Sequence, residues 1–180
     1  MTIDYRLSFS DHVNQVVKKC SSMLYSLCKI RYLLNYNEAK LIYTSIIRPM
    51  IEYGGSILID LPVVSSQKLE AIQNKAIKVI CQAPSKFSVT DGRILLNLHT
   101  LCARRDFFFR SMVGKAQCAL ASDELRNLLD QVLTHKRTLR SGSNYVLPSA
   151  NINFRKRRFT YNAIKLLHYG LCTDILSFDQ

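Results

Sequence analysis

Residues 10–34 read SDHVNQVVKKCSSMLYSLCKIRYLL, and this stretch decides the fold class. Its apolar side chains recur at spacings of three and four, which is the period of an α-helix with one buried face. The apolar positions are Val13, Val16, Val17, Cys20, Met23, Leu24, Leu27, Ile30 and Leu34. We expect Ser10 or Asp11 to cap the start, because a short side-chain oxygen accepts an orphan backbone N–H there. Asn35 is the expected stop. The basic residues off this stripe are Lys18, Lys19, Lys29 and Arg31.

The same period predicts two further helices. Asn37 is expected to cap the second helix, and Pro49 to kink or end it, because proline removes a helical hydrogen bond. The apolar positions of this helix are Ala39, Ile42, Tyr43, Ile46, Ile47 and Met50. The third helix is expected to start near Ser65 and Ser66 and to end before Pro84. Its expected buried positions are Leu69, Ile72, Ala76, Ile77 and Ile80, with Lys68, Lys75 and Lys78 on other faces.

Shorter helices follow downstream. Residues 90–96 predict a short helix, and Thr100 is expected to cap a longer one. The expected shared face of that longer helix consists of Leu101, Arg105, Phe108, Met112 and Ala116. Ser122 begins another amphipathic pattern, and residues 159–167 predict a short terminal helix. The chain is therefore expected to be mainly α, with a helical domain over residues 1–130 and an irregular basic C-terminal segment over residues 131–180.

The charge balance points to a polyanionic partner. The 180 residues carry 25 Lys and Arg against 13 Asp and Glu, a net charge of +12. No acidic residue stands between Asp130 and Asp174. The basic residues of that interval are Lys136, Arg137, Arg140, Arg155, Lys156, Arg157, Arg158 and Lys165, and they alternate with Tyr145, Phe154, Phe159 and Tyr161. Such a pattern favours phosphate contacts with base stacking. A solvated or nuclear-localisation-like run is the alternative for 155–158.

The motifs of common enzymes are missing from the sequence. It has no paired aspartates for two-metal chemistry, no glycine-rich phosphate loop and no nucleophile elbow. The six cysteines form no C-x-x-C pair, so we expect no metal or other cofactor and a reducing compartment in which they act as small buried apolar residues. With no signal peptide or membrane-spanning run, we expect an intracellular protein, cytoplasmic or nuclear, that does not enter membranes.

Whole phrases of the sequence resemble the reverse transcriptases of non-LTR (LINE, jockey-like) retrotransposons. Residues 1–13, MTIDYRLSFSDHV, resemble the family's "I-D-x-x-L-x-F-x-x-H-(I/V)", which marks the passage from palm to thumb. Residues 39–54, AKLIYTSIIRPMIEYG, resemble "L-Y-x-S-x-I-x-P-x-(L/I)-x-Y-(G/A)". Residues 68–76, KLEAIQNKA, resemble "K-L-E-x-(I/L)-Q-N-(K/R)-A", the most diagnostic phrase. Arg104 and Arg105 fit a later "L-x-x-R-R", and 159–163 fit "F-x-Y-x-A".

The resemblance implies a thumb-like helical bundle that is the thumb-side C-terminal fragment of an RNA-directed DNA polymerase. Such a fragment lacks the palm aspartates, so it is expected to be non-catalytic alone. Its implied role is to bind RNA or an RNA–DNA duplex through phosphates without base specificity, next to the missing palm domain. The candidate thumb contacts are Lys18, Lys19, Lys29, Lys75, Lys78, Arg104 and Arg105, and the cluster over 136–158 is the candidate for flanking nucleic acid.

Two alternatives stay open. The chain has no tryptophan, and Leu58 stands where the family usually has one, which is typical of relaxed constraint. A non-functional truncated remnant is therefore one alternative, and a standalone helical protein-interaction module is the other.

Overall fold

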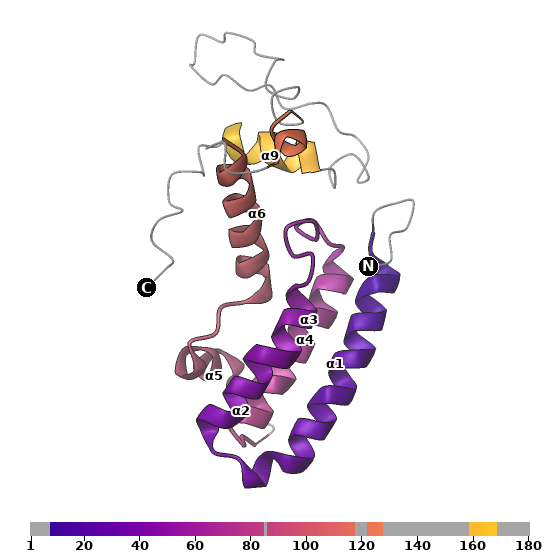
Figure 1. Cartoon of the computed structure of the whole chain (residues 1–180). Helices are drawn as coiled ribbons and strands as arrows, with labels where there is room; N and C mark the ends of the chain where they lie inside the picture. The colour runs from indigo at the N-terminus through magenta and orange to yellow at the C-terminus, as the bar shows by residue number, and fades with distance from the viewer. Residues whose placement is uncertain (1–7, 85, 118–121, 128–158, 169–180) are drawn as a thin grey trace. The chain divides into compact units, whose positions relative to one another are not determined.

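A computed structural model describes residues 8–84, 86–117, 122–127 and 159–168 of the chain (Figure 1). Within these residues every regular element is a helix, which confirms the expected mainly α fold. The chain divides into two compact units, Met1–Arg105 and Asp106–Gln180.

The first unit is built on two parallel helices, which are joined in the sequence by a segment that runs back in the opposite direction. Its elements are α1 (Ser10–Ile30), a 3-10 turn (Arg31–Leu33), α2 (Tyr36–Ile42), a π turn (Tyr43–Ile47), α3 (Arg48–Glu52), α4 (Val63–Ile80), α5 (Val89–Leu96) and the start of α6 (Leu101–Gln117). Near the two helix starts, Lys68 Nζ donates to Asn14 Oδ1 at 2.7 Å, and Arg31, just past the end of α1, bonds the last carbonyls of α4. The segment from α2 to α3 runs back in the opposite direction and also packs against α1, while α1 and α4 contact each other directly (Figure 1).

The core of this unit lies where α1, α4 and the returning segment meet. The buried apolar residues on α1 are Val13, Cys20, Leu24 and Leu27, and those on α4 are Leu69, Ile72, Ala76, Ile77 and Ile80. The face expected for α4 is thereby confirmed. On α1 the buried stripe is narrower than expected: Val16 and Val17 are only partly buried, and Met23 and Ile30 are exposed. The reason is that α1 packs mainly on one neighbour, α4. A single neighbour covers only a narrow line of side chains, and the buried residues of α1 follow one another at intervals of seven, four and three residues.

The caps of the first two helices differ from those expected. The residue before α1 is Phe9, which adopts a left-handed conformation with φ 53° and provides no side-chain cap, so the expected cap at Ser10 or Asp11 is wrong. Asn35, and not Asn37, caps α2. Its Oδ1 accepts from the Glu38 N–H at 2.9 Å, and the Glu38 carboxylate accepts from the Asn35 N–H at 2.8 Å. This reciprocal pair is a capping box, which needs a spacing of three residues that Asn37 does not have.

Pro49 is accommodated without ending the helical path. It lies at the start of α3, directly after the π turn Tyr43–Ile47. A proline cannot donate its helical hydrogen bond and crowds the carbonyl four residues earlier. The wider π turn relieves that conflict by shifting the backbone register before the proline. The expected kink is thus a local change of helix type, and the chain leaves the helix after Glu52, before the two glycines at 54 and 55.

Helix α6 begins as expected but buries a different face. The Ala103 N–H donates to Thr100 Oγ1 at 3.2 Å, which confirms Thr100 as the cap. The buried residues are Leu101, Arg105, Phe109, Val113 and Ala116, whereas Phe108 and Met112 are half-buried, so the expectation is wrong for those two.

In the second unit, residues 123–127 are also helical, and α9 (Phe159–His168) confirms the expected terminal helix. The expected boundary at residues 130 and 131 lies outside the described residues.

Candidate nucleic-acid interface

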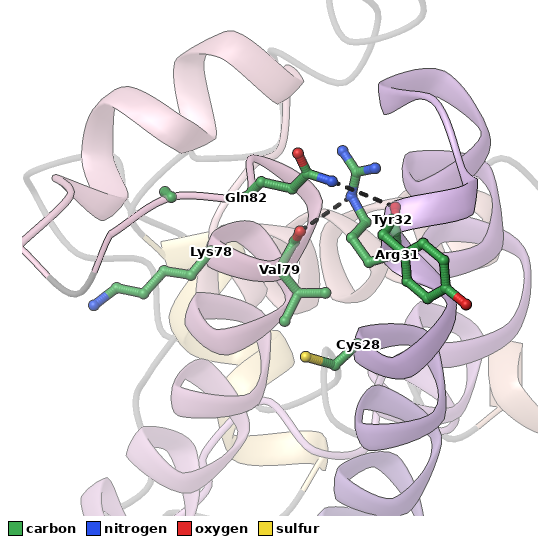
Figure 2. A pocket seen from close by; sticks show the side chains of 7 residues that line it. Cys28, Arg31, Tyr32, Lys78, Val79 and Gln82 are labelled. Carbon is green, nitrogen blue, oxygen red and sulfur yellow. Dashed lines mark hydrogen bonds between the residues drawn. The ribbon is translucent and has the colours of Figure 1, made fainter.

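A groove runs between α1 and α4 on the surface of the first unit. It consists of two adjoining hollows of about 390 Å³ and 360 Å³ that share Cys28, Lys78 and Val79. We call this surface the α1–α4 groove. Its remaining lining residues are Ser21, Leu24, Tyr25, Arg31, Tyr32, Lys75, Gln82 and Ala83. Figure 2 shows Cys28 opposite Val79, with Lys78 on one side of the groove and Tyr32 on the other. None of the described residues that line it is acidic.

Arg31 closes one end of the groove from inside. Its side chain is buried and reaches 48 residues along the chain, where Nη2 donates to the Ile80 carbonyl at 2.6 Å and Nε to the Val79 carbonyl at 3.2 Å. Nη1 donates to the Leu34 carbonyl at 2.6 Å. Parallel helices bring their C-terminal ends together, and both ends carry unpaired carbonyls and partial negative charge. A guanidinium between them neutralises both. The periodic pattern placed Arg31 off the apolar stripe and gave no sign of this role.

Lysines line the α4 wall of the groove, and two further lysines stand on α1 beside it. Lys75 is exposed and Lys78 is half-buried on the α4 wall. On α1, Lys18 and Lys29 are exposed. Lys18 stands seven residues before Tyr25 and Lys29 four residues after it, so all three side chains share one face of the helix. The Lys29 Nζ lies 5.2 Å from the centre of the Tyr25 ring, within the range of a cation–π contact. The structure therefore gathers four of the candidate lysines around this groove. Lys19 is exposed on the next face of α1.

Arg104 and Arg105 have internal partners instead. Both guanidinium edges of Arg104 contact the Glu52 carboxylate, with Nη2 2.9 Å from Oε2, and Glu52 also binds Arg48 at 2.8 Å. Arg105 is only 5% exposed, and its Nη2 donates to Ser66 Oγ at 2.7 Å. These contacts fasten the start of α6 to α3 and α4. The prediction that Arg105 contacts phosphate at the surface is therefore wrong, because the residue is buried.

The phrase at 68–76 also makes contacts within the first unit. Glu70 accepts from Arg93 Nη2 at 2.9 Å and from the Cys102 N–H at 3.1 Å, and Asn74 accepts from the same Arg93 nitrogen at 2.8 Å. Gln73 is buried and donates to the His99 carbonyl at 2.9 Å. These polar residues tie α4 to α5 and to the chain leading into α6. Sequence reasoning recognised the phrase but missed this role, because its partners lie 19 to 32 residues away.

The basic C-terminal candidates lie outside the described residues. They are Lys136, Arg137, Arg140, Arg155, Lys156, Arg157 and Arg158, with Tyr145 and Phe154 among them. Lys165 is on α9 and is exposed.

The thiols of the described residues fall into two groups. Cys20 is buried and Cys81 is half-buried, and burial raises the pKa of both thiols, which favours their protonated form. Cys28 and Cys102 are exposed, contrary to the expectation that the cysteines are buried. Among these same residues no cluster of three metal-ligating side chains occurs, and no helix has the length and apolar character to cross a membrane.

Comparisons with known protein families, with curated proteins and with solved structures find no match to this chain. The family resemblance of the sequence therefore stays a prediction. The function is best argued from the α1–α4 groove, where cationic and aromatic side chains line one surface.

Proposed function

We propose that this chain binds nucleic acid through its phosphates, without base specificity, and has no catalytic activity of its own. In this proposal it is the thumb-side C-terminal fragment of a retrotransposon RNA-directed DNA polymerase. Its ligands are RNA or an RNA–DNA duplex, and its protein partner is the missing palm domain. The observation that carries the proposal is the acid-free α1–α4 groove, lined by Lys75 and Lys78 and flanked by Lys18 and Lys29.

The charge arrangement supports a polyanion as the ligand. Phosphate neutralisation by lysine and arginine releases counterions, and this supplies most sequence-independent affinity. The two acidic residues on α1 and α4 stand away from the groove: Asp11 is in the first turn of α1, and Glu70 accepts from Arg93 and the Cys102 N–H. Neither of these two carboxylates is among the described residues that line the groove.

A different observation favours the protein-interaction alternative. Several large apolar side chains of the first unit face solvent, among them Ile94 at 76% and Leu95 at 64% on α5. An exposed apolar face of this kind fits a helix or domain partner. In the thumb proposal the missing palm domain covers such a face, so the two functions are compatible. Binding to nucleic acid in the absence of any partner protein distinguishes the first function from the second.

The test is the salt dependence of duplex binding by the full chain. With four to six phosphates contacted, the logarithm of the association constant should fall against log[salt] with a slope of roughly −4 to −5. The double variant Lys75→Ala with Lys78→Ala should weaken binding and shallow that slope by about 2 units. The matched control, Lys40→Ala with Lys115→Ala, removes the same charge outside the groove and should change the slope much less. Equal effects of the two pairs, with helix content unchanged, would reject the groove as the interface.

The C-terminal basic cluster is tested in the same assay. Changing residues 155–158 together to alanine should shallow the slope by up to about 3–4 units if all four contact phosphates. We expect a shared contribution from this cluster and the groove. An unaltered slope with intact helicity would identify 155–158 as solvated surface.

The non-catalytic part of the proposal is tested by primer extension with purified protein, Mg²⁺ and dNTPs. No extension is expected, because the sequence offers no paired carboxylates to hold two metal ions. Templated extension that persists through repeated purification would contradict this part.

A further inference from the structure

Two exposed tyrosines line the same groove, one in each hollow. Tyr25 is 63% exposed and lines the hollow of about 360 Å³ with Lys75. Tyr32 is 77% exposed and lines the hollow of about 390 Å³ with Lys78. Both rings come from the end of α1 and the turn that follows it, and both lysines come from α4. The groove therefore has an aromatic wall and a cationic wall. Phosphate binding alone explains the cationic wall and leaves the aromatic wall without a role.

We propose that the α1–α4 groove binds a single-stranded segment of nucleic acid, with bases stacked on Tyr25 and Tyr32 and phosphates against Lys75 and Lys78. This inference rests on the proposed function and specifies its ligand. In a duplex each base face is already covered by its neighbours, so a protein ring gains little. An unpaired base offers a free face, and stacking on it is tolerant of sequence. The two rings are thus selective for strand state and not for base identity.

The dimensions of the groove fit a few nucleotides. Tyr25 lies near the end of α1 and Tyr32 follows seven residues later in the 3-10 turn, which places them roughly 10 Å apart along the axis. A stacked strand advances about 3.4 Å per nucleotide, so the rings span about three nucleotides, close to the smallest known single-strand site sizes of about four. The two hollows, at about 390 and 360 Å³, lie at the low end of the roughly 300–1,000 Å³ typical of small-ligand sites. Each suits one nucleotide.

The contact between Lys29 and Tyr25 prepares the first ring for stacking. The Lys29 Nζ lies over the ring of Tyr25 at 5.2 Å from its centre. It orients the ring and occupies one of its faces. A base on the opposite face then completes a sandwich in which the ammonium is also near the phosphate backbone. No acidic residue lines either hollow to compete for that ammonium.

The experiment compares a labelled 12-nucleotide oligo(U) with a 12-base-pair RNA duplex, each bound to the full chain at about 50 mM salt. The variant Tyr25→Ala with Tyr32→Ala should bind oligo(U) roughly 10- to 100-fold more weakly, from the usual cost of losing one or two stacked bases, with duplex binding nearly unchanged. The variant Tyr25→Phe with Tyr32→Phe retains both rings and should bind oligo(U) like the parent chain. Tyr53→Ala removes an equally exposed tyrosine (64%) that does not line the groove, and it should change neither affinity.

Intrinsic fluorescence supplies a second readout. The chain contains nine tyrosines and no tryptophan, so tyrosine emission is directly observable. Oligo(U) should quench the parent chain, and the phenylalanine pair should lose part of that quenching while keeping its affinity. Oligo(U) binding that is lost in the Lys75 and Lys78 variant but unchanged in the tyrosine-to-alanine pair overturns the single-strand inference alone. Absence of binding to both oligonucleotides by the parent chain overturns the proposed function as well.

Discussion

Arg31 is expected to be a major determinant of stability in the first unit, which is tested by Arg31→Ala. The side chain joins the ends of α1 and α4 through carbonyls of Leu34, Val79 and Ile80, with two contacts at 2.6 Å. A hydrogen bond from a charged donor contributes about 1.5–3 kcal/mol, so the two short bonds set an upper range of about 3–6 kcal/mol. Water partly replaces the lost donor at a helix end. We therefore expect a loss of about 2–4 kcal/mol in the free energy of unfolding.

Urea unfolding followed by far-UV circular dichroism measures this loss. Arg31→Lys keeps the charge but concentrates its donors on one nitrogen, so it cannot span three carbonyls and should recover only part of the loss. Arg31→Met keeps much of the side-chain volume, and so separates packing from hydrogen bonding. Lys19→Ala, an exposed charge on the same helix, should stay within about 0.5 kcal/mol of the parent. The reasoning is refuted if Arg31→Ala is as stable as Lys19→Ala, or if Arg31→Met is as stable as the parent.

Three further substitutions test other parts of the fold. Gly92→Ala should destabilise by roughly 1–3 kcal/mol, because the new Cβ would lie at 2.4 Å, well inside contact distance, from the Ile77 side chain; thermal unfolding checks this, and a neutral result would mean that the neighbouring side chains yield freely. Tyr43→Phe should not destabilise at neutral pH, because the Tyr43 hydroxyl is buried without a hydrogen-bond partner among the described residues. Burial raises the pKa of Tyr43, so the parent should lose stability as pH rises above about 10, where the unfolded tyrosine ionises, and the phenylalanine variant should lose less; identical alkaline unfolding curves would contradict this. Glu52→Gln should cost about 1–3 kcal/mol in urea unfolding, because it weakens contacts to two arginines, Arg104 among them; a loss no larger than that of an exposed Glu124→Gln would argue against the cluster.

The features predicted well from the sequence are those set by local periodicity. The buried face of α4 and the cap at Thr100 follow from spacing alone, since each depends on residues within one or two helical turns. The caps of α1 and α2 were missed for a local reason. Several short polar residues compete near each helix start, and the choice of Asn35 depends on the exact distance to Glu38. The presence of each helix was therefore predictable. The residue at which a helix begins was predictable only where a single capping residue was available.

The features that could not be predicted depend on contacts between distant residues. Arg31 reads as a solvated charge at the end of a polar face, yet it is buried because the parallel packing of α1 and α4 brings their carbonyls together. Arg105 is a candidate phosphate contact on the family resemblance, yet it is buried against Ser66, on the face of α6 where the helical period had placed it. In both, a long side chain with several donors satisfies groups on another helix. Composition treats every lysine and arginine alike, and only packing separates the structural arginines from the lysines left at the surface.

That separation changes which part of the recognised phrase carries function. In residues 68–76, Leu69, Ile72 and Ala76 are buried in the core, and the polar side chains of Glu70, Gln73 and Asn74 bind α5 or the chain before α6. Lys68 bonds Asn14 on α1. Lys75 is left exposed on the groove wall. These contacts fix the position of α4, and the position of α4 sets the width and charge of the groove. Under the proposed function, loss of the polar contacts of residues 68–76 should therefore disturb nucleic-acid binding without removing a single phosphate contact, whereas loss of Lys75 should weaken binding and leave the fold intact.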